Sequence, residues 1–395
     1  MIDSKDIEKL RRETPGCENK IHLNNADAGL MPSPVLNKMI EHLELEAKTG
    51  GYEAAEFKHH EIHEFYQQAG RLVNCSPGNI AYTNSATDSY SRALSSIPFK
   101  KGDILLTTND DYISNQIAFL SFKKRFEIEI VRIPNAEYGG IDLDKAYQLI
   151  SDLNPKLVAV THVPTNSGLI QPVEQVGKFC SEFGVLYLVD ACQSVGQLNI
   201  DVQKIGCDFL SVTCRKFLRG PRGAGLLYVS DRILEENYEP LFIDMQGAKW
   251  QDKDLYITQE SAQRFEDWEF PYALLLGSNE AIKYALNIGI SNIEERVRYL
   301  AGYLRDNLMD NKKLRLLDRG DDLCGIITLS IANKTAEEIK LLLNNDNINS
   351  SITYREYAVI DFDEKGVDWA LRISPHYYNT IEEIDQFISI LKKVC

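Results

Sequence analysis

The chain has 395 residues, of which 44% are hydrophobic and 26% are charged, and its formal net charge is −15. This composition is typical of soluble globular proteins, and so acidic a chain has no electrostatic attraction for nucleic acid or an anionic membrane surface. We therefore expect neither as a partner.

Several further features are absent from the sequence. No apolar run reaches the length of a membrane span, and the charged N-terminus lacks the apolar core of a signal peptide. The eight cysteines, of which Cys395 is the last, form no CxxC pair. His59 and His63 share one helix face, but the run around them does not match the HExxH pattern. We expect a cytoplasmic protein with reduced thiols and no metal site.

Short apolar runs alternate with helical patterns between about residues 80 and 230. The expected strands are Ile80–Thr83, Ile104–Thr108, Ile128–Ile133, Leu157–His162, Val185–Asp190, Phe209–Thr213 and Gly225–Val229. Strands that are apolar throughout are covered on both faces, and helices between strands indicate parallel pairing with right-handed crossovers. The sequence therefore predicts an α/β fold whose large domain has a mostly parallel seven-stranded sheet flanked by helices.

The pattern changes after about residue 275. Long helical stretches give way to shorter elements, which we place at Leu274–Gly289, Ile293–Leu308, Leu314–Leu317, Gly325–Ile331, Ala336–Leu343, Ile352–Tyr354, Trp369–Ser374 and Ile381–Lys392. We predict a smaller C-terminal α/β domain over residues 276–395 and a large domain over residues 21–275. Residues 1–20 are expected to pack on the small domain.

Two residues in the large domain carry the clearest chemical signal. Asp190 ends an apolar strand, and Lys216 follows 26 residues later, just before the Gly220–Pro221 turn. A lysine amine can condense with the aldehyde of pyridoxal phosphate, and a carboxylate can keep the pyridine nitrogen protonated. Taken alone, Asp190 could be a helix N-cap and Lys216 could belong to a cationic surface turn. Their combination favours a pyridoxal phosphate site.

Other segments could complete such a site. Small residues over 83–89, between a strand and a helix, can present backbone N–H groups to a phosphate, although an N-cap without a ligand explains them equally well. Arg215, or Arg219 or Arg222, offers a guanidinium for the same phosphate. Arg372, at the end of a strand, could bind a substrate carboxylate or form a surface ion pair.

These residues resemble the class V aminotransferase family of pyridoxal phosphate enzymes, which have fold type I. The resemblance begins at His22–Ala26 and ends at Arg372–Asp385, so it covers nearly the whole chain. It implies a homodimer that acts on a small amino acid. The implied catalytic residues are Lys216, Tyr112 and Asp190. The implied cofactor-binding residues are Ala86, Thr87, Tyr112, Thr165, Asp190, Gln193, Thr213, Arg215 and Lys216, and the substrate-binding residues are Asn25 and Arg372.

The chain departs from the family pattern at several positions. Tyr112 stands where many members stack a histidine on the cofactor, and Trp268-Glu269 replaces a Gly-Thr pair. The stretch from residue 354 to residue 368 contains no cysteine, whereas desulfurases carry a nucleophilic cysteine there. Asp27 lies in a segment that usually has small residues. Three segments, 50–54, 264–269 and 376–380, are similar to those of hercynylcysteine sulfoxide C–S lyases.

The resemblance, with the missing cysteine, implies a C–S lyase. Such an enzyme cleaves an S-substituted cysteine or its sulfoxide by β-elimination to pyruvate and ammonia, with Tyr112 as a candidate acid for the leaving group. A class V aminotransferase or an amino-acid epimerase remains an alternative with the same cofactor. A non-catalytic binding protein on the same fold is a third possibility.

Overall fold

The computed structural model describes residues 2–309 and 311–394, and Cys395 lies outside them. Its large sheet has seven strands in the order β2-β8-β7-β6-β5-β3-β4. Their bounds are β2 (Ile80–Thr83), β3 (Ile104–Thr108), β4 (Glu129–Ile133), β5 (Leu157–Thr161), β6 (Leu186–Asp190), β7 (Phe209–Thr213) and β8 (Gly225–Val229). Only β8 runs antiparallel to its neighbours. The predicted α/β fold is confirmed, and four of the seven strands have the predicted bounds.

Side chains of the central strands alternate between two apolar layers. Val158 and Val160 face one layer, whereas Leu157 and Ala159 face the other. The first layer is formed by α4 (His59–Val73), α7 (Leu143–Leu153), α8 (Val173–Phe183) and α11 (Tyr272–Ile288). The second is formed by α5 (Ala86–Ser96) and α6 (Ile113–Phe126). Burial on both faces explains the continuous apolar runs, since each buried Val or Leu contributes about 1.5–3 kcal/mol.

The smaller domain is built on a four-stranded antiparallel sheet. Its order is β11-β12-β15-β14, with bounds β11 (Leu314–Leu316), β12 (Ile327–Ile331), β14 (Ser351–Tyr354) and β15 (Trp369–Ile373). Three helices complete its apolar core, namely α12 (Ile290–Met309), α13 (Ala336–Asn345) and α15 (Ile381–Val394). This sheet carries Arg372 toward the large domain.

The chain passes between the domains at Gly289. Helix α11 packs on α2 (Ser33–Thr49) and α4 of the large domain, whereas α12 packs on α15 and β11. Gly289 has φ +89°, a conformation that glycine adopts without steric cost, and it ends α11. We therefore propose a boundary at Gly289 instead of residue 275.

The N-terminal residues contact both domains. Within α1 (Ser4–Arg12), Arg11 forms an ion pair with Glu383 of the small domain at 2.9 Å, while Leu10 joins the apolar core of the large one. Strand β1 (Ile21–His22) pairs in parallel with β13 (Ile348–Asn349). Strand β1, which lies a few residues before Ala26 in the chain, is thus anchored to the small domain.

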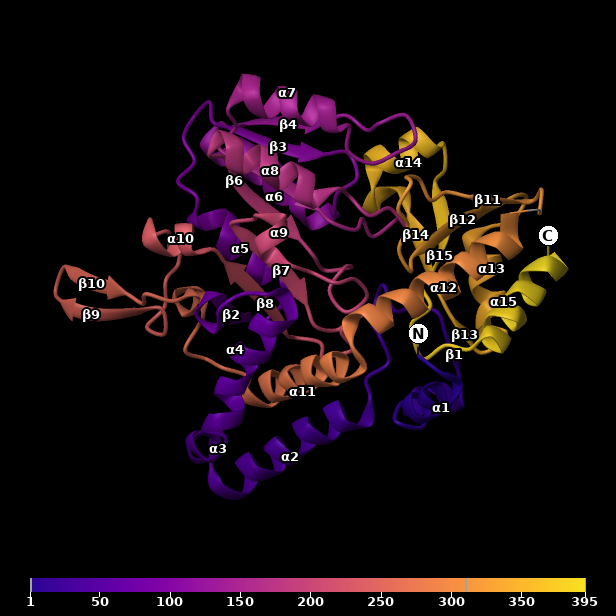
Figure 1. Ribbon diagram of the computed structural model, residues 1–395, viewed down its shortest axis with the longest axis horizontal. Coiled ribbons are helices and arrows are strands. Elements are labelled where there is room, and N and C mark those ends of the chain that lie inside the picture. The colour runs from indigo at the N-terminus through magenta and orange to yellow at the C-terminus, as the bar shows by residue number, and fades with distance from the viewer. Residues whose placement is uncertain (1, 310, 395) are drawn as a thin grey trace.

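The sequence analysis placed no element over residues 248–258, where the structure has a hairpin of β9 (Ala248–Asp252) and β10 (Leu255–Thr258). Figure 1 shows it projecting from the large domain at the left of the view. The remaining elements are α3 (Gly51–Phe57), α9 (Val202–Ile205), α10 (Asp231–Glu235), α14 (Val359–Lys365), η1 (Pro15–Glu18), η2 (Pro77–Asn79), η3 (Ala262–Phe265) and η4 (Arg355–Tyr357). None of the helices in the described residues is long and apolar enough to cross a bilayer.

Candidate active site

A cavity lies where β5, β6 and β7 end at their carboxyl termini. Parallel strands of an open α/β sheet bring their following residues together at this edge. Nine of the eleven residues predicted for the site line the cavity: Ala86, Thr87, Tyr112, Thr165, Asp190, Gln193, Thr213, Arg215 and Lys216. The sequence did not single out five further lining residues as site residues: Ser85, Asn115, Thr161, Val163 and Cys192.

One end of the cavity is formed by the start of helix α5. The Ser85 hydroxyl accepts a hydrogen bond from the Asp88 N–H at 3.1 Å and so caps the helix. The N–H groups of the first turn point out of the helix and carry partial positive charge. Together with the Arg215 guanidinium, this end of the cavity suits a phosphate group.

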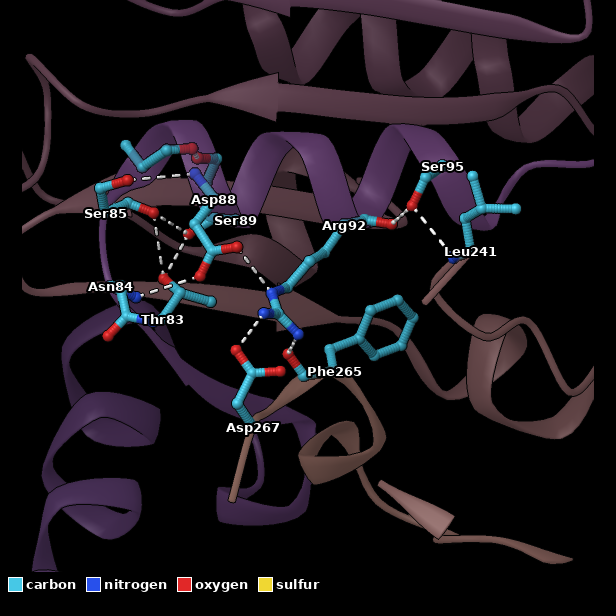
Figure 2. Close-up of polar contacts among 12 residues, drawn as sticks. Thr83, Asn84, Ser85, Asp88, Ser89, Arg92, Ser95, Leu241, Phe265 and Asp267 are labelled. Carbon is cyan, nitrogen blue, oxygen red and sulfur yellow. Dashed lines mark hydrogen bonds and ion pairs between the residues drawn. The ribbon is translucent and has the colours of Figure 1, made fainter. Parts of the chain in front are cut away.

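The start of α5 is tied to a distant segment (Figure 2). Arg92 donates to Asp88 at 2.8 Å, to Asp267 at 2.5 Å and to the Phe265 carbonyl at 2.9 Å. The Ser89 hydroxyl also contacts Thr83 Oγ1 at 2.6 Å. These contacts fix the position of the helix end relative to the sheet.

Asp190 lies deep in the cavity, with 4% of its surface exposed. Its Oδ2 accepts a hydrogen bond from the Asn115 side-chain amide at 3.0 Å, and its Oδ1 accepts one from the Cys192 N–H at 3.0 Å. The second contact is a local hydrogen bond from the backbone to the side chain, but no helix begins after Asp190, since the next one is α9; the N-cap interpretation of this residue is therefore wrong. The carboxylate is therefore oriented by donors on both oxygens.

A second buried carboxylate, Asp111, supports the first. It accepts hydrogen bonds from the side chains of Thr161, Asn115, Gln116 and Thr107. Burial raises the pKa of Asp111, and these donors oppose that rise. Asp111 thus helps to hold Asn115 against Asp190.

Lys216 is 6% exposed, and its Nζ lies 5.8 Å from the centroid of the Tyr112 ring. Burial lowers the pKa of Lys216 below its usual range; the Asp190 charge opposes this, and Arg215 and Arg372 add to it. An amine with a lowered pKa is a better nucleophile and proton acceptor near neutral pH.

Backbone contacts hold the lysine segment in place. The Gly29 N–H donates to the Arg215 carbonyl at 2.8 Å, and a Cβ on Gly29 would approach the Lys216 carbonyl oxygen to 2.5 Å. A side chain at position 29 would therefore displace the lysine from the cavity.

Gln193 and Thr165 lie on the side of the cavity that faces the small domain. The Gln193 amide nitrogen donates to the Ala26 carbonyl at 3.0 Å and to Thr165 Oγ1 at 3.4 Å. Its buried Oε1 has no hydrogen-bond partner among the described residues. Arg372 donates from Nη1 to the Thr165 carbonyl at 3.2 Å, so it reaches the edge of the cavity without lining it.

Asn25, by contrast, is fully buried away from the cavity. Its amide nitrogen donates to the Ser374 carbonyl at 2.8 Å, and its carbonyl accepts from the Tyr378 hydroxyl at 2.6 Å. Because both ends of the amide are used within the protein, we assign Asn25 to joining the domains rather than to binding substrate.

Arg219 is not available for the phosphate. It is 1% exposed, donates to the Leu30 carbonyl at 2.7 Å and to Thr14 Oγ1 at 2.6 Å, and also donates to the Tyr377 hydroxyl. Its guanidinium lies 4.5 Å from the Tyr378 ring centroid. Of the three arginines considered for the phosphate, only Arg215 lines the cavity.

Comparisons with known proteins agree with this fold. The family model "Aminotransferase class-V" matches residues 21–387. A probable cysteine desulfurase of Methanothermobacter thermautotrophicus is 26% identical over 397 residues, which cover 98% of each chain. The apo structure of a cysteine desulfurase from Thermococcus onnurineus NA1 superposes with a TM-score of 0.90 at 24% identity, covering 98% of this chain and 97% of that one. The cystine C–S lyase C-DES, in complex with cysteine persulfide, gives 0.86 at 20% identity, with 96% and 98% covered.

The fold and the lysine–aspartate cavity define a pyridoxal phosphate enzyme of fold type I. The chain belongs to the class V aminotransferase family, since the family model spans most of its length. The predicted family, cofactor and enzyme class are thereby confirmed. The finer resemblance to hercynylcysteine sulfoxide lyases is not confirmed, because these relatives carry other names.

The residues present fit this cofactor. A buried amine with a lowered pKa, Lys216, opens into the same cavity as a buried carboxylate, Asp190. The helix end at Ala86 and the Arg215 guanidinium lie along the wall of this cavity and supply positive charge for a phosphate. The aromatic ring of Tyr112 adds a flat surface suited to a planar ring.

Proposed function

We propose that this protein is a C–S lyase that cleaves an S-substituted cysteine, or its sulfoxide, by β-elimination to pyruvate and ammonia. Cleavage of a C–S bond is supported by the relatives, which are named cysteine desulfurases and a cystine C–S lyase. A reaction in which the sulfur leaves without being transferred to a cysteine of the enzyme is supported by the residues of this chain.

The observation that carries this choice is the folded segment from residue 354 to residue 368. It contains no cysteine and forms η4 and α14. Lys365 pairs with Asp361 at 2.7 Å within α14, and both side chains are buried. Desulfurases of the resembled family carry their nucleophilic cysteine in the corresponding segment. This chain therefore has no sulfur acceptor there.

Cys192, the one cysteine that lines the cavity, is a poor substitute. It is 9% exposed, and burial together with the Asp190 charge raises its pKa well above the usual thiol range. A thiol must be ionised to attack sulfur. Cys192 therefore stays protonated at neutral pH and does not accept sulfur from a substrate.

The chain's own residues divide the work as follows. When bound, pyridoxal phosphate supplies an electron sink for the negative charge that develops at the substrate α-carbon. With the cofactor bound, Asp190 would keep the pyridine nitrogen protonated, and the helix end at Ala86 and Thr87, with Thr213 and Arg215, would hold the phosphate. Lys216 would hold the cofactor before substrate arrives and would then accept the α-proton on its Nζ.

Two further residues act on the substrate. Arg372 holds the α-carboxylate beside Thr165, which fixes the face of the substrate that Lys216 reaches. The Tyr112 hydroxyl donates a proton to the departing sulfur, as a positioned general acid does. The Lys216–Tyr112 distance of 5.8 Å, measured to the ring centroid, supports their action on adjacent substrate atoms.

We also propose that the protein works as a homodimer in the cytoplasm. Large apolar side chains are exposed on the hairpin and on the segment before it, namely Leu241, Phe242, Met245, Trp250, Leu255 and Ile257. A patch of this kind marks a contact surface in a protein of otherwise ordinary composition. Light scattering on the purified protein tests this, and a monomeric mass would contradict it.

The products of the reaction test the proposed function. The purified protein is saturated with pyridoxal phosphate and incubated separately with L-cysteine, cystine, S-alkyl cysteines and their sulfoxides, while pyruvate, ammonia and alanine are measured. β-Elimination predicts pyruvate and ammonia in equal amounts, and none from the Lys216→Ala variant. Alanine in amounts equal to the sulfur released would identify a desulfurase instead, and a keto acid that retains sulfur would identify a transaminase.

A further inference from the structure

Asp27, which has no role in the function proposed above, forms an ion pair with Arg372 at the edge of the cavity. Asp27 Oδ1 accepts a hydrogen bond from Arg372 Nη2. The Arg372 side chain is 3% exposed, whereas that of Asp27 is 46% exposed. A carboxylate of the protein thus already occupies the guanidinium that would bind the substrate carboxylate.

The Asp27 carboxylate is held from more than one side. Burial raises its pKa, but the Arg372 charge and hydrogen bond, with the nearby side chains of Ser351 and Asn24, lower it below the usual range. Ser351 is paired directly opposite Arg372 in the β14–β15 register, and Asn24 forms an isolated bridge with Ser374. The site that receives Asp27 is therefore built by the strand edge of the small domain.

The pair also lies beside the reacting groups. Arg372 Nη1 donates to the carbonyl of Thr165, which lines the cavity. Ala26, the residue before Asp27, accepts the Gln193 amide at 3.0 Å. Arg372 adds to the lowering of the Lys216 pKa, which reflects its proximity to the amine.

Two of the five N–H donors of Arg372 are already used within the protein. A guanidinium offers two edges for bidentate binding, Nε with Nη2 and Nη1 with Nη2. Asp27 accepts one N–H of Nη2, a nitrogen that belongs to both edges, and the Thr165 carbonyl accepts one N–H of Nη1. Only Nε, which is buried, has no partner among the described residues.

We propose that Asp27 is a specificity-determining residue that competes with the substrate α-carboxylate for Arg372, so that substrate binds only by displacing it. This inference rests on the proposed function for the role of Arg372. Exchange of one carboxylate for the other keeps Arg372 paired. The released Asp27 is half exposed and stays beside Ser351 and Asn24, so it can be solvated at modest cost.

The competition has a definite consequence for ligand selection. Asp27 lowers the affinity of the protein for ligands that have an α-carboxylate, and it leaves the affinity for ligands that lack one unchanged. The rest of the substrate must then supply the affinity, so Asp27 favours amino acids whose sulfur substituent makes contacts of its own.

The test measures ligand affinity by calorimetry on the cofactor-loaded protein. S-methyl-L-cysteine and S-methylcysteamine, which lacks the carboxylate, are titrated into Lys216→Ala and into Lys216→Ala/Asp27→Asn, because protein that lacks Lys216 does not consume the first ligand. We expect the dissociation constant of S-methyl-L-cysteine to fall about fivefold or more in the double variant, on the scale of a partly exposed ion pair, and that of S-methylcysteamine to stay unchanged. In steady-state assays of the single variant Asp27→Asn, KM falls with little change in kcat.

Two controls separate this role from a structural one. Asp306→Asn makes the same charge change on the exposed face of α12 and leaves both constants unchanged. If Asp27→Asn does not fold, Asp27→Ser provides the same comparison. Unchanged or weaker binding of S-methyl-L-cysteine in a folded Asp27 variant would overturn the inference. If S-methyl-L-cysteine binds more tightly to the Asp27 variant but no substrate yields pyruvate, the proposed function is overturned. The competition between Asp27 and ligand carboxylates for Arg372 would still stand.

Discussion

The side-chain amide of Asn115 donates a hydrogen bond to Asp190 Oδ2 at 3.0 Å, and the same amide nitrogen lies 3.2 Å from Asp111 Oδ1. Asn115 thus connects two buried carboxylates, one of which faces the cavity. Because it sits in the first turn of α6, three residues after Tyr112, it also fixes the tyrosine relative to Asp190.

Replacing Asn115 should therefore disturb the cofactor site without touching the lysine. In Asn115→Ala, Asp190 loses one of its two donors, and a hydrogen bond to a charged group contributes about 1.5–3 kcal/mol. We expect the dissociation constant of pyridoxal phosphate to rise at least about tenfold. Equilibrium dialysis measures this, with Ser114→Ala on the same helix as the control; equal affinities in the two variants would contradict the role of Asn115.

Arg219 should be a major contributor to stability. Its buried guanidinium joins Thr14, Leu30 and the Tyr377 hydroxyl, so removal leaves several of these groups without a partner. We expect Arg219→Ala to lower the free energy of unfolding by about 3 kcal/mol or more. The exposed Arg222→Ala should change it by less than about 0.5 kcal/mol in urea denaturation. Similar losses in both variants would show that the contacts of Arg219 contribute little.

The buried carboxyl of Glu266 should make stability depend on pH. Burial raises the pKa of Glu266 to about 8, although the Tyr82 N–H and the Tyr66 hydroxyl donate to it. Because this pKa is higher in the folded chain than in the unfolded chain, the contribution of the protonated acid is complete below about pH 4.5 and is lost as pH rises toward 8.

The Glu266→Gln variant has no proton to lose at this position. We expect it to gain stability over the wild type by about 1 kcal/mol per pH unit between pH 5 and 8, with no further gain above pH 8. Denaturation at a series of pH values measures the difference. The free energy of unfolding of the exposed control Glu269→Gln should depend on pH as that of the wild type does. The same pH dependence in Glu266→Gln would refute the protonated state of Glu266 in the folded chain.

Tyr112 should matter most when the leaving group is poor. Tyr112→Phe keeps the ring but removes the hydroxyl that we propose as the acid, and general acids contribute about a hundredfold or more. We expect kcat to fall about a hundredfold for S-alkyl cysteines and far less for cystine, whose leaving group is already stable as an anion. Stopped assays with both substrates decide this, and equal losses for the two would assign Tyr112 to positioning alone.

Much of the fold could be predicted because its signals are local. The central strands are continuous apolar runs ended by polar residues such as Thr213 and Asp190, and helices with clear periodicity separate them. The β9–β10 hairpin was missed because Trp250 and Ile257 are exposed, so its sequence lacks the buried face that marks a strand. The boundary that we propose at Gly289 has little signal in the sequence, because helical patterns lie on both sides of it.

Site residues that end a strand could be predicted from the sequence, whereas residues whose place depends on tertiary contacts could not. Asp190 and Thr213 end strands and so could be placed at the cavity from sequence. The sequence made Arg219 a candidate for binding the phosphate. In the structure its backbone has φ +61°, and its guanidinium donates instead to the Tyr377 hydroxyl of the small domain. Asn115 carried a usable signal, since it lies one helical turn from Tyr112 on the same face.

The central claim is that pyridoxal phosphate is held covalently by Lys216. The purified protein is treated with borohydride and digested, and the peptides are examined by mass spectrometry. The account predicts the mass of the reduced cofactor on the peptide that contains Lys216, and its absence from the Lys216→Ala variant. The mass on a different lysine, or on no peptide of the cofactor-saturated protein, would contradict it.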